Sequence, residues 1–181
     1  MIKDNIDWHQ VRKFKSADFS ESPDTYAEPR LIYSLDAVRE FHGHRVYPSP
    51  VPGALARFDG SMASQHYVGN KQKPTRLATA VDIFPEGIPM AFFTCALGIN
   101  AFKGVGIYLD TTGIDGTAWV MFHLDIRPKG FDDPQPLIWI ATKQIDTQTR
   151  KVTTKYFYPQ SDTSKWALLN NPIMYEDKVR I

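Results

Sequence analysis

The chain contains little cysteine and no long apolar segment. Its single cysteine, Cys95, cannot form a disulfide within the chain, so we expect a fold that needs no oxidising compartment. Cys95 lies in an apolar run, where a buried structural thiol is expected. No stretch approaches a transmembrane span, and the N-terminal residues lack the apolar core of a signal peptide. If the protein acts outside the cytoplasm, we therefore expect another component to carry it there.

A large excess of charge is also missing. The 181 residues include 21 Lys and Arg against 20 Asp and Glu, and the sequence holds no dense basic cluster. Binding of nucleic acid or of a membrane surface through bulk positive charge is therefore not expected. The hydrophobic content of 43% is typical of a soluble globular protein. The length predicts one domain over residues 1–181 with a substantial core.

The hydrophobic pattern mixes helical and strand-like segments and so predicts an α+β fold. The clearest helix is expected over residues 29–42, where apolar residues recur at helical spacing and Gly43 follows as a left-handed cap. A second helix is expected over residues 90–99, and residues 3–15 predict a short helix or an ordered arm. Strands, including a C-terminal hairpin, are expected at residues 45–47, 77–84, 104–109, 118–127, 137–145 and 152–158, with a last short helix at residues 166–169.

Two histidines and an aspartate stand in apolar, strand-like surroundings. These are His66, Asp82 and His123, of which the last two are each flanked by large apolar residues. A buried carboxylate is costly unless it is paired or bound to a metal, because it loses its solvation. Three protein ligands that leave a fourth position open are typical of a catalytic zinc site. The residues therefore predict a metal site. His42 and His44, at a helix end, are instead expected to be solvated side chains beside the terminal carbonyls.

Four short motifs follow one another along the chain. Residues 64–66 form Ser-x-His, residues 80–82 form Ala-x-Asp, residues 104–108 form Gly-x-Gly-x-Tyr, and residues 122–125 form an apolar residue followed by His-x-Asp. In this order the motifs resemble the M15 peptidase family of zinc D-Ala-D-Ala peptidases and peptidoglycan endopeptidases, in particular its bacteriophage members. The resemblance covers about residues 14–128, and residues 129–181 form a C-terminal extension. The His-Glu-x-x-His motif of other zinc peptidases is absent.

The resemblance implies a small antiparallel sheet flanked by helices, with His66, Asp82 and His123 as the zinc ligands. It also places Ser64 near the site, where the hydroxyl would orient His66 or a substrate carbonyl. The alternative for Ser64 is a serine that satisfies local backbone. Arg57 is the nearest candidate for the arginine with which the family binds a substrate carboxylate, and its alternative is a surface arginine without a role.

The general base is less clear from the motifs. Several family members carry an acidic base three residues before the last histidine, and that position here is Val120. Asp125 is the candidate for the catalytic base, or for a partner of the metal ligands, if it shares a strand face with His123. Asp110 and Asp115 are further candidates on the adjacent loop.

The activity implied by the resemblance is zinc-dependent hydrolysis of peptide bonds in bacterial peptidoglycan. The protein would be phage-encoded, either an endolysin or a virion-associated enzyme. It would start in the host cytoplasm and reach the cell wall later, or act from the virion. Two alternatives stay open: an inactive structural protein of a phage tail or virion that keeps the peptidase fold, with virion proteins as partners, and a module that binds the cell wall without cleaving it.

Overall fold

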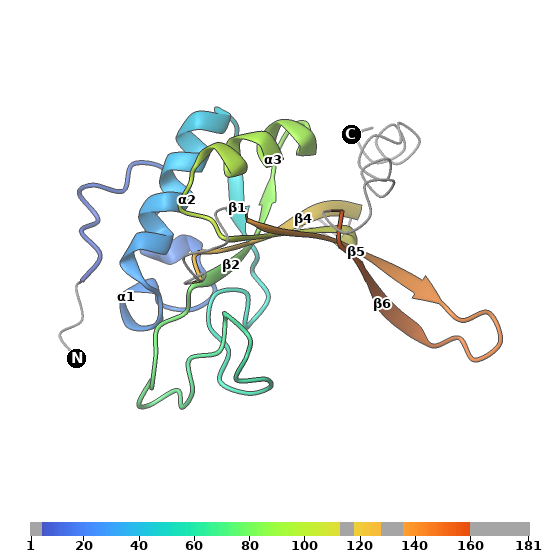
Figure 1. The fold of residues 1–181 in the computed structure, drawn as a ribbon. Coiled ribbons are helices and arrows are strands. Elements are labelled where there is room, and N and C mark those ends of the chain that lie inside the picture. The colour runs from blue at the N-terminus through green and yellow to red at the C-terminus, as the bar shows by residue number, and fades with distance from the viewer. Residues whose placement is uncertain (1–4, 113–117, 128–135, 160–181) are drawn as a thin grey trace.

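The computed structural model describes residues 5–112, 118–127 and 136–159. In these segments the chain has an α+β fold built on one six-stranded sheet (Figure 1). The helical elements are the 3-10 helix η1 (Ser16–Asp18) and the α-helices α1 (Pro23–Tyr26), α2 (Pro29–His42) and α3 (Pro89–Gly98). The strands are β1 (Val46–Pro48), β2 (Ala80–Pro85), β3 (Gly104–Thr112), β4 (Ala118–Asp125), β5 (Leu137–Ile145) and β6 (Val152–Phe157). None of the described helices is long and apolar enough to cross a membrane.

The two longer helices lie where the sequence predicts them. Helix α2 begins at Pro29, whose missing N–H costs nothing in the first turn, and it ends at Gly43 with φ 76°. The Gly43 N–H donates to the carbonyl of Arg39 at 3.1 Å, which satisfies one terminal carbonyl. Helix α3 likewise begins at a proline, Pro89. Cys95, expected to be buried, is only half-buried in this helix.

The N-terminal residues form an ordered arm rather than a helix. Residues 5–15 contain turns but no helical segment, and the buried side chains of Ile6, Val11 and Phe14 join the hydrophobic core. The arm is fixed to α2 because the Asp36 carboxylate accepts the backbone N–H groups of Arg12 and Lys13. Of the two alternatives for this region, the arm is therefore confirmed.

The sheet is mixed, whereas the resemblance of the four motifs to a known family implied an antiparallel one. Its strand order is β1-β2-β4-β3-β5-β6, and all neighbours are antiparallel except β3 and β5. The predicted hairpin of β5 and β6 is confirmed, and it projects beyond the helices (Figure 1). Because β5 pairs along β3, the C-terminal segment completes the sheet, and Ile138 and Ile140 belong to the core. The helix expected at residues 166–169 lies outside the described residues.

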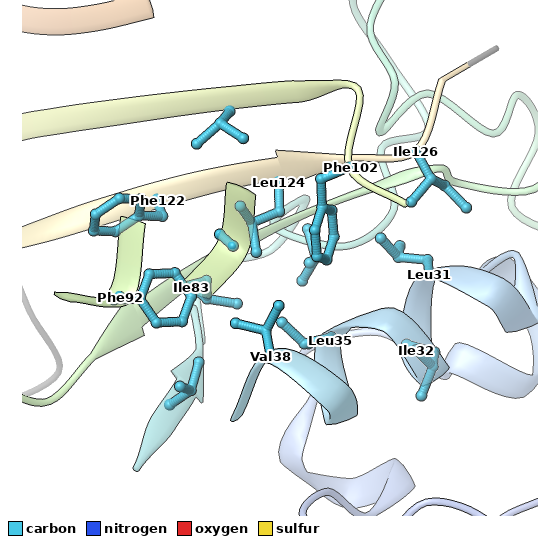
Figure 2. Packing of buried hydrophobic residues seen from close by; sticks show 14 of the residues in the cluster. Leu31, Ile32, Leu35, Val38, Ile83, Phe92, Phe102, Phe122, Leu124 and Ile126 are labelled. Atoms are coloured by element: carbon cyan, nitrogen blue, oxygen red, sulfur yellow. The ribbon is translucent and has the colours of Figure 1, made fainter. Parts of the chain in front are cut away.

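One face of the sheet is aliphatic and aromatic and is covered by α2 and α3. Leu31 and Val38 of α2 and Phe92 of α3 belong to one hydrophobic cluster with Ile83 of β2 and Phe122 of β4 (Figure 2). All five of these side chains are at most 1% exposed. Because side chains alternate along a strand, the neighbouring residues of each strand point to the opposite face. That opposite face carries the candidate metal ligands.

Candidate metal centre

The strand register brings two of the three predicted ligands together. Asp82 of β2 pairs with His123 of β4, and His123 pairs on its other side with Gly106 of β3. Gly106 in turn pairs with Trp139 of β5. Asp82, His123 and Trp139 therefore lie in one row across the sheet, on the face opposite the helices.

The third ligand, His66, comes from an irregular segment, although its surroundings in the sequence are strand-like. Residues 49–79 connect β1 to β2 and contain only isolated bridges, among them one between Arg57 and Tyr67. The Arg57 N–H donates to the His66 carbonyl at 2.7 Å, and the Thr79 N–H donates to the Gln65 carbonyl at 3.0 Å. These bonds fix the His66 backbone above the sheet without a continuous strand.

The three side chains converge on one point. Asp82 Oδ1 lies 3.0 Å from His123 Nδ1 and 3.4 Å from His66 Nε2, and the two ring nitrogens are 2.9 Å apart. Bond lengths of about 2.0–2.1 Å in a tetrahedral zinc site separate neighbouring ligand atoms by roughly 3.3 Å. The observed spacing is close to that value, and the three residues are 2–8% exposed. His66, Asp82 and His123 therefore form a buried group that could hold a metal ion.

The charges of the site stabilise one another. Burial would raise the pKa of Asp82, but hydrogen bonds to His123 and His66 outweigh it and hold that pKa far below its usual range. Burial would lower the pKa of His123, but hydrogen bonds to Asp125 and Asp82 raise it to about 9. Without a metal, His123 is thus a cation between two carboxylates. A metal ion at this position would replace that positive charge.

Asp125 lies behind His123 rather than beside the converging ligand atoms. Its Oδ2 is 3.3 Å from His123 Nε2, the ring nitrogen that does not face Asp82. Arg127 binds the same carboxylate through three contacts. Its Nε donates to Oδ1 at 2.7 Å, its backbone N–H donates to Oδ1 at 3.2 Å, and its Nη2 contacts Oδ2. These bonds, with that of His123, lower the pKa of the fully buried Asp125 to about 2 although burial opposes them. This geometry favours Asp125 as a residue that positions His123 and not as the catalytic base.

The Gly-x-Gly motif of β3 makes room for side chains from the neighbouring strands. A Cβ atom at Gly104 would lie closer than 3.0 Å to the carboxylate of Asp125, and one at Gly106 equally close to the indole of Trp139. The Trp139 ring lies 5.2 Å from the His123 ring, centroid to centroid. Two glycines on β3 therefore admit the two side chains that support His123.

Val120 faces away from the metal ligands. It is three residues before His123 on the extended strand β4, so its side chain points to the helix-covered face, where it packs against the core. A carboxylate at this position of this strand could not approach the ligands. Among the described residues, Asp82 and Asp125 are the only carboxylates within 4.0 Å of the ring nitrogens of His66 or His123.

Of the two other acidic candidates for the base, the structure describes only Asp110. The Asp110 carboxylate accepts the backbone N–H of Lys143 at 3.1 Å and so joins β3 to the hairpin. Asp115 lies outside the described residues.

Arg57 and Ser64 both lie in the segment that carries His66. Arg57 Nη2 is 3.8 Å from Asp82 Oδ2, and the Arg57 side chain is 47% exposed, so a charged group beside the ligands also faces solvent. Ser64 Oγ accepts the His66 backbone N–H at 3.3 Å, and the Ser64 carbonyl accepts from Arg76. These contacts support the backbone role of Ser64, not contact with the His66 ring.

Two supporting residues were missed from the sequence. Arg127 could have been found from its place two residues after Asp125, which is close enough in the sequence for the two opposite charges to pair. Trp139 lies on β5, and no local feature of the sequence indicates that this residue approaches His123. His42, expected to be solvated, is 8% exposed and its Nε2 lies 2.8 Å from the carbonyl oxygen of Glu86.

Comparison with models of known protein families, with characterised proteins and with solved structures finds no match for this chain.

Proposed function

We propose that the protein is a zinc-dependent peptidase that hydrolyses peptide bonds of bacterial peptidoglycan and is encoded by a phage. The observation that carries the metal-dependent part is the buried convergence of His66 Nε2, Asp82 Oδ1 and His123 Nδ1 at 2.9–3.4 Å. The peptidase activity and the peptidoglycan substrate rest on the four motifs that resemble the M15 family.

Each residue has a defined task in this proposal. A zinc ion held by His66, Asp82 and His123 would act as a Lewis acid toward a carbonyl and lower the pKa of water. Asp125 and Arg127 hold the His123 ring so that Nε2 carries the proton and the Nδ1 lone pair faces the metal position. Buried carboxylate partners of this kind fix both the tautomer and the orientation of a metal-binding histidine.

Arg57 gives the site a means to bind an anionic substrate group. Its guanidinium is near Asp82 but does not form a close pair with it, at 3.8 Å. A guanidinium that is half exposed can therefore turn toward a carboxylate of a stem peptide, which it would bind with two parallel hydrogen bonds.

The test combines metal content with activity on purified cell walls. We expect about one zinc per chain by elemental mass spectrometry, lost in a His123→Ala variant and retained in a His9→Ala variant, since His9 is exposed and away from the ligands. We expect new amino termini in peptidoglycan digested by the zinc-loaded chain. If the chain binds no zinc after zinc is supplied, the proposed metal site is wrong. If it binds zinc but produces no new amino termini, the proposed peptidoglycan substrate is wrong.

The hairpin favours a second candidate, a structural phage protein without turnover. On the hairpin, Ile145, Val152 and Tyr156 are 49–64% exposed, and such apolar groups suit contact with a neighbouring subunit. A stable ring or higher oligomer in sedimentation, together with no released amino termini, would support this candidate over the enzyme. A third candidate is a module that binds the wall without cleaving it, in which case peptidoglycan would retain the protein and release no peptides.

A further inference from the structure

A cavity lies away from the metal ligands, between the N-terminal arm, α2 and β1. Its volume is about 810 Å³, within the range of small-ligand sites. A neighbouring hollow of about 170 Å³ shares three of its lining residues and extends toward Gly43 and His44 at the end of α2. We call the two together the basic groove, because they are lined by five cationic side chains: Arg12, Lys13, Lys15, Arg39 and Arg45.

Most of these cations lack a carboxylate partner. Lys13 Nζ lies 3.0 Å from Glu40, but within the described chain none of the other four has a carboxylate oxygen within 4.0 Å. The one acidic residue in the lining is Asp18, and its carboxylate already accepts the backbone N–H of Lys15 at 2.8 Å. The groove therefore carries a local excess of positive charge in a protein whose net charge is only +1.

The groove is held by the fold and is not a chance run of charges in the sequence. Three of the cations come from the arm, Arg39 from α2 and Arg45 from the residue before β1. The arm is fixed by the Asp36 carboxylate, and Arg39 lies over the Phe14 ring at 4.7 Å while it donates to the Lys13 carbonyl. A ligand would thus meet cations on both sides whose positions are already restricted.

The aromatic residues that line the groove already have partners within the protein. Trp8 packs against the hydrophobic core, and its Nε1–H donates to the Asp24 carboxylate at 2.7 Å. Phe14 is 3% exposed, with Arg39 over its ring. The Tyr47 ring meets the Trp119 ring edge-on at 6.1 Å, and the Tyr47 hydroxyl donates to Glu86 at 2.5 Å. Proteins that bind single-stranded nucleic acid stack bases on exposed aromatic faces. The groove is therefore suited to a ligand that is recognised through its anionic groups alone.

We propose that the basic groove binds a flexible chain of repeated phosphodiester groups without bases, of the poly(glycerol phosphate) type. The groove brings together cations from three elements, which provides contacts for several phosphates of one chain. The four cations without a carboxylate partner would each displace a counterion from that chain. None of the residues that line the groove is a candidate metal ligand, so the binding does not depend on the proposed peptidase activity.

The experiment is a titration of the full chain with fluorescein-labelled poly(glycerol phosphate), followed by fluorescence anisotropy at several salt concentrations. With four cations engaged, we expect the affinity to fall roughly 50-fold between 50 and 200 mM salt, by the slope of a single-stranded polyphosphate. An Arg12→Gln, Lys15→Gln variant should bind at least about tenfold more weakly and with a smaller salt slope. Both side chains are exposed, so the fold should survive, which thermal unfolding checks.

A Lys143→Gln, Lys151→Gln variant is the matched control, because it removes the same charge from the exposed hairpin. It should bind like the parent chain; equal weakening of the two variants would overturn a localised site. Chelator in the buffer should leave the affinity unchanged, since loss of binding would mean that the polymer contacts a metal. Equal affinity for inorganic phosphate, or tighter binding of a DNA oligonucleotide with as many phosphates, would also overturn the proposal.

Discussion

Gly106 and His123 are directly paired across β3 and β4, and the missing side chain at Gly106 leaves the space in which Trp139 lies beside the His123 ring. The same strand pair places Gly104 opposite Asp125, whose carboxylate occupies the space that a Cβ atom would fill. Two groups therefore position His123, the Asp125 carboxylate and the Trp139 indole, and each occupies the space beside a glycine of β3. The geometry of the metal ligands therefore depends on the absence of side chains at two positions of β3.

Gly106→Ala should destabilise the protein and weaken metal binding together. The new Cβ atom would lie closer than 3.0 Å to the indole of Trp139, so the ring or the strand must shift. Overpacking of this kind typically costs about 1–3 kcal/mol of unfolding free energy. Gly98→Ala is the matched control, because a Cβ atom there meets nothing within 4 Å. Chemical denaturation and zinc titration of both variants measure the difference; similar values for the two would contradict the packing argument.

Asp125→Asn separates a positioning residue from a general base. An asparagine keeps the shape but cannot stabilise the His123 proton as a carboxylate does, and loss of such a partner typically lowers metal affinity about 10–100-fold. If Asp125 only positions His123, saturating zinc should restore most of the activity. If it is the base, the rate at saturating zinc should stay low and the acidic limb of the pH profile should disappear. Asp59→Asn, at an exposed position, serves as the control.

Local sequence signals predicted helices α2 and α3, the hairpin and the two strand-borne ligands. Helix α2 has a proline at its start, regular apolar spacing and a glycine cap, and each of these acts over a few residues. Asp82 and His123 were recognisable because polar groups between large apolar residues need a partner. The side of His123 on which Asp125 lies could not be predicted, since alternation gives the strand face but not the ring rotamer.

Relationships between distant segments were the part that the sequence did not reveal. The parallel pairing of β5 with β3 brings Trp139 to His123, and no local pattern marks a strand as parallel when only one such pair exists. His66 lies in an irregular segment, where backbone hydrogen bonds to residues far along the chain replace a strand. The basic groove likewise gathers cations from three elements that are separate in the sequence.

The metal-free protein should lose stability as the pH rises toward 9. In the folded state the pKa of His123 is raised to about 9, above its ordinary value of 6.5. The protonated ring therefore stabilises the fold fully below pH 6.5, and this contribution is lost as the pH rises through about 9. Thermal unfolding with chelator should show a melting temperature that falls over this interval, and a His123→Gln variant should show a flatter curve. A melting temperature that rises from pH 6.5 to 9 would contradict the ion-pair geometry.

Zinc binding should release a proton, because the metal must displace the Nδ1 proton of His123 that faces Asp82, whereas the Nε2 proton that faces Asp125 stays. The apparent affinity should therefore increase with pH up to about 9, the pKa of the metal-free His123. Calorimetry in buffers of different ionisation enthalpy measures the number of protons released. At pH 7 we expect about one proton from His123, and no release would show that the ring is already neutral.

Arg57→Ala tests whether the exposed guanidinium beside Asp82 binds a substrate carboxylate. At 3.8 Å and 47% exposure, its pairing with Asp82 contributes little to stability, so the variant should fold and bind zinc like the parent chain. The KM for a stem peptide with a free terminal carboxylate should rise about tenfold or more, since a bidentate arginine–carboxylate contact is lost. The same peptide with an amidated terminus is the matched control, and its KM should not depend on residue 57. If both peptides lose affinity equally, Arg57 acts on the site as a whole and not on the carboxylate.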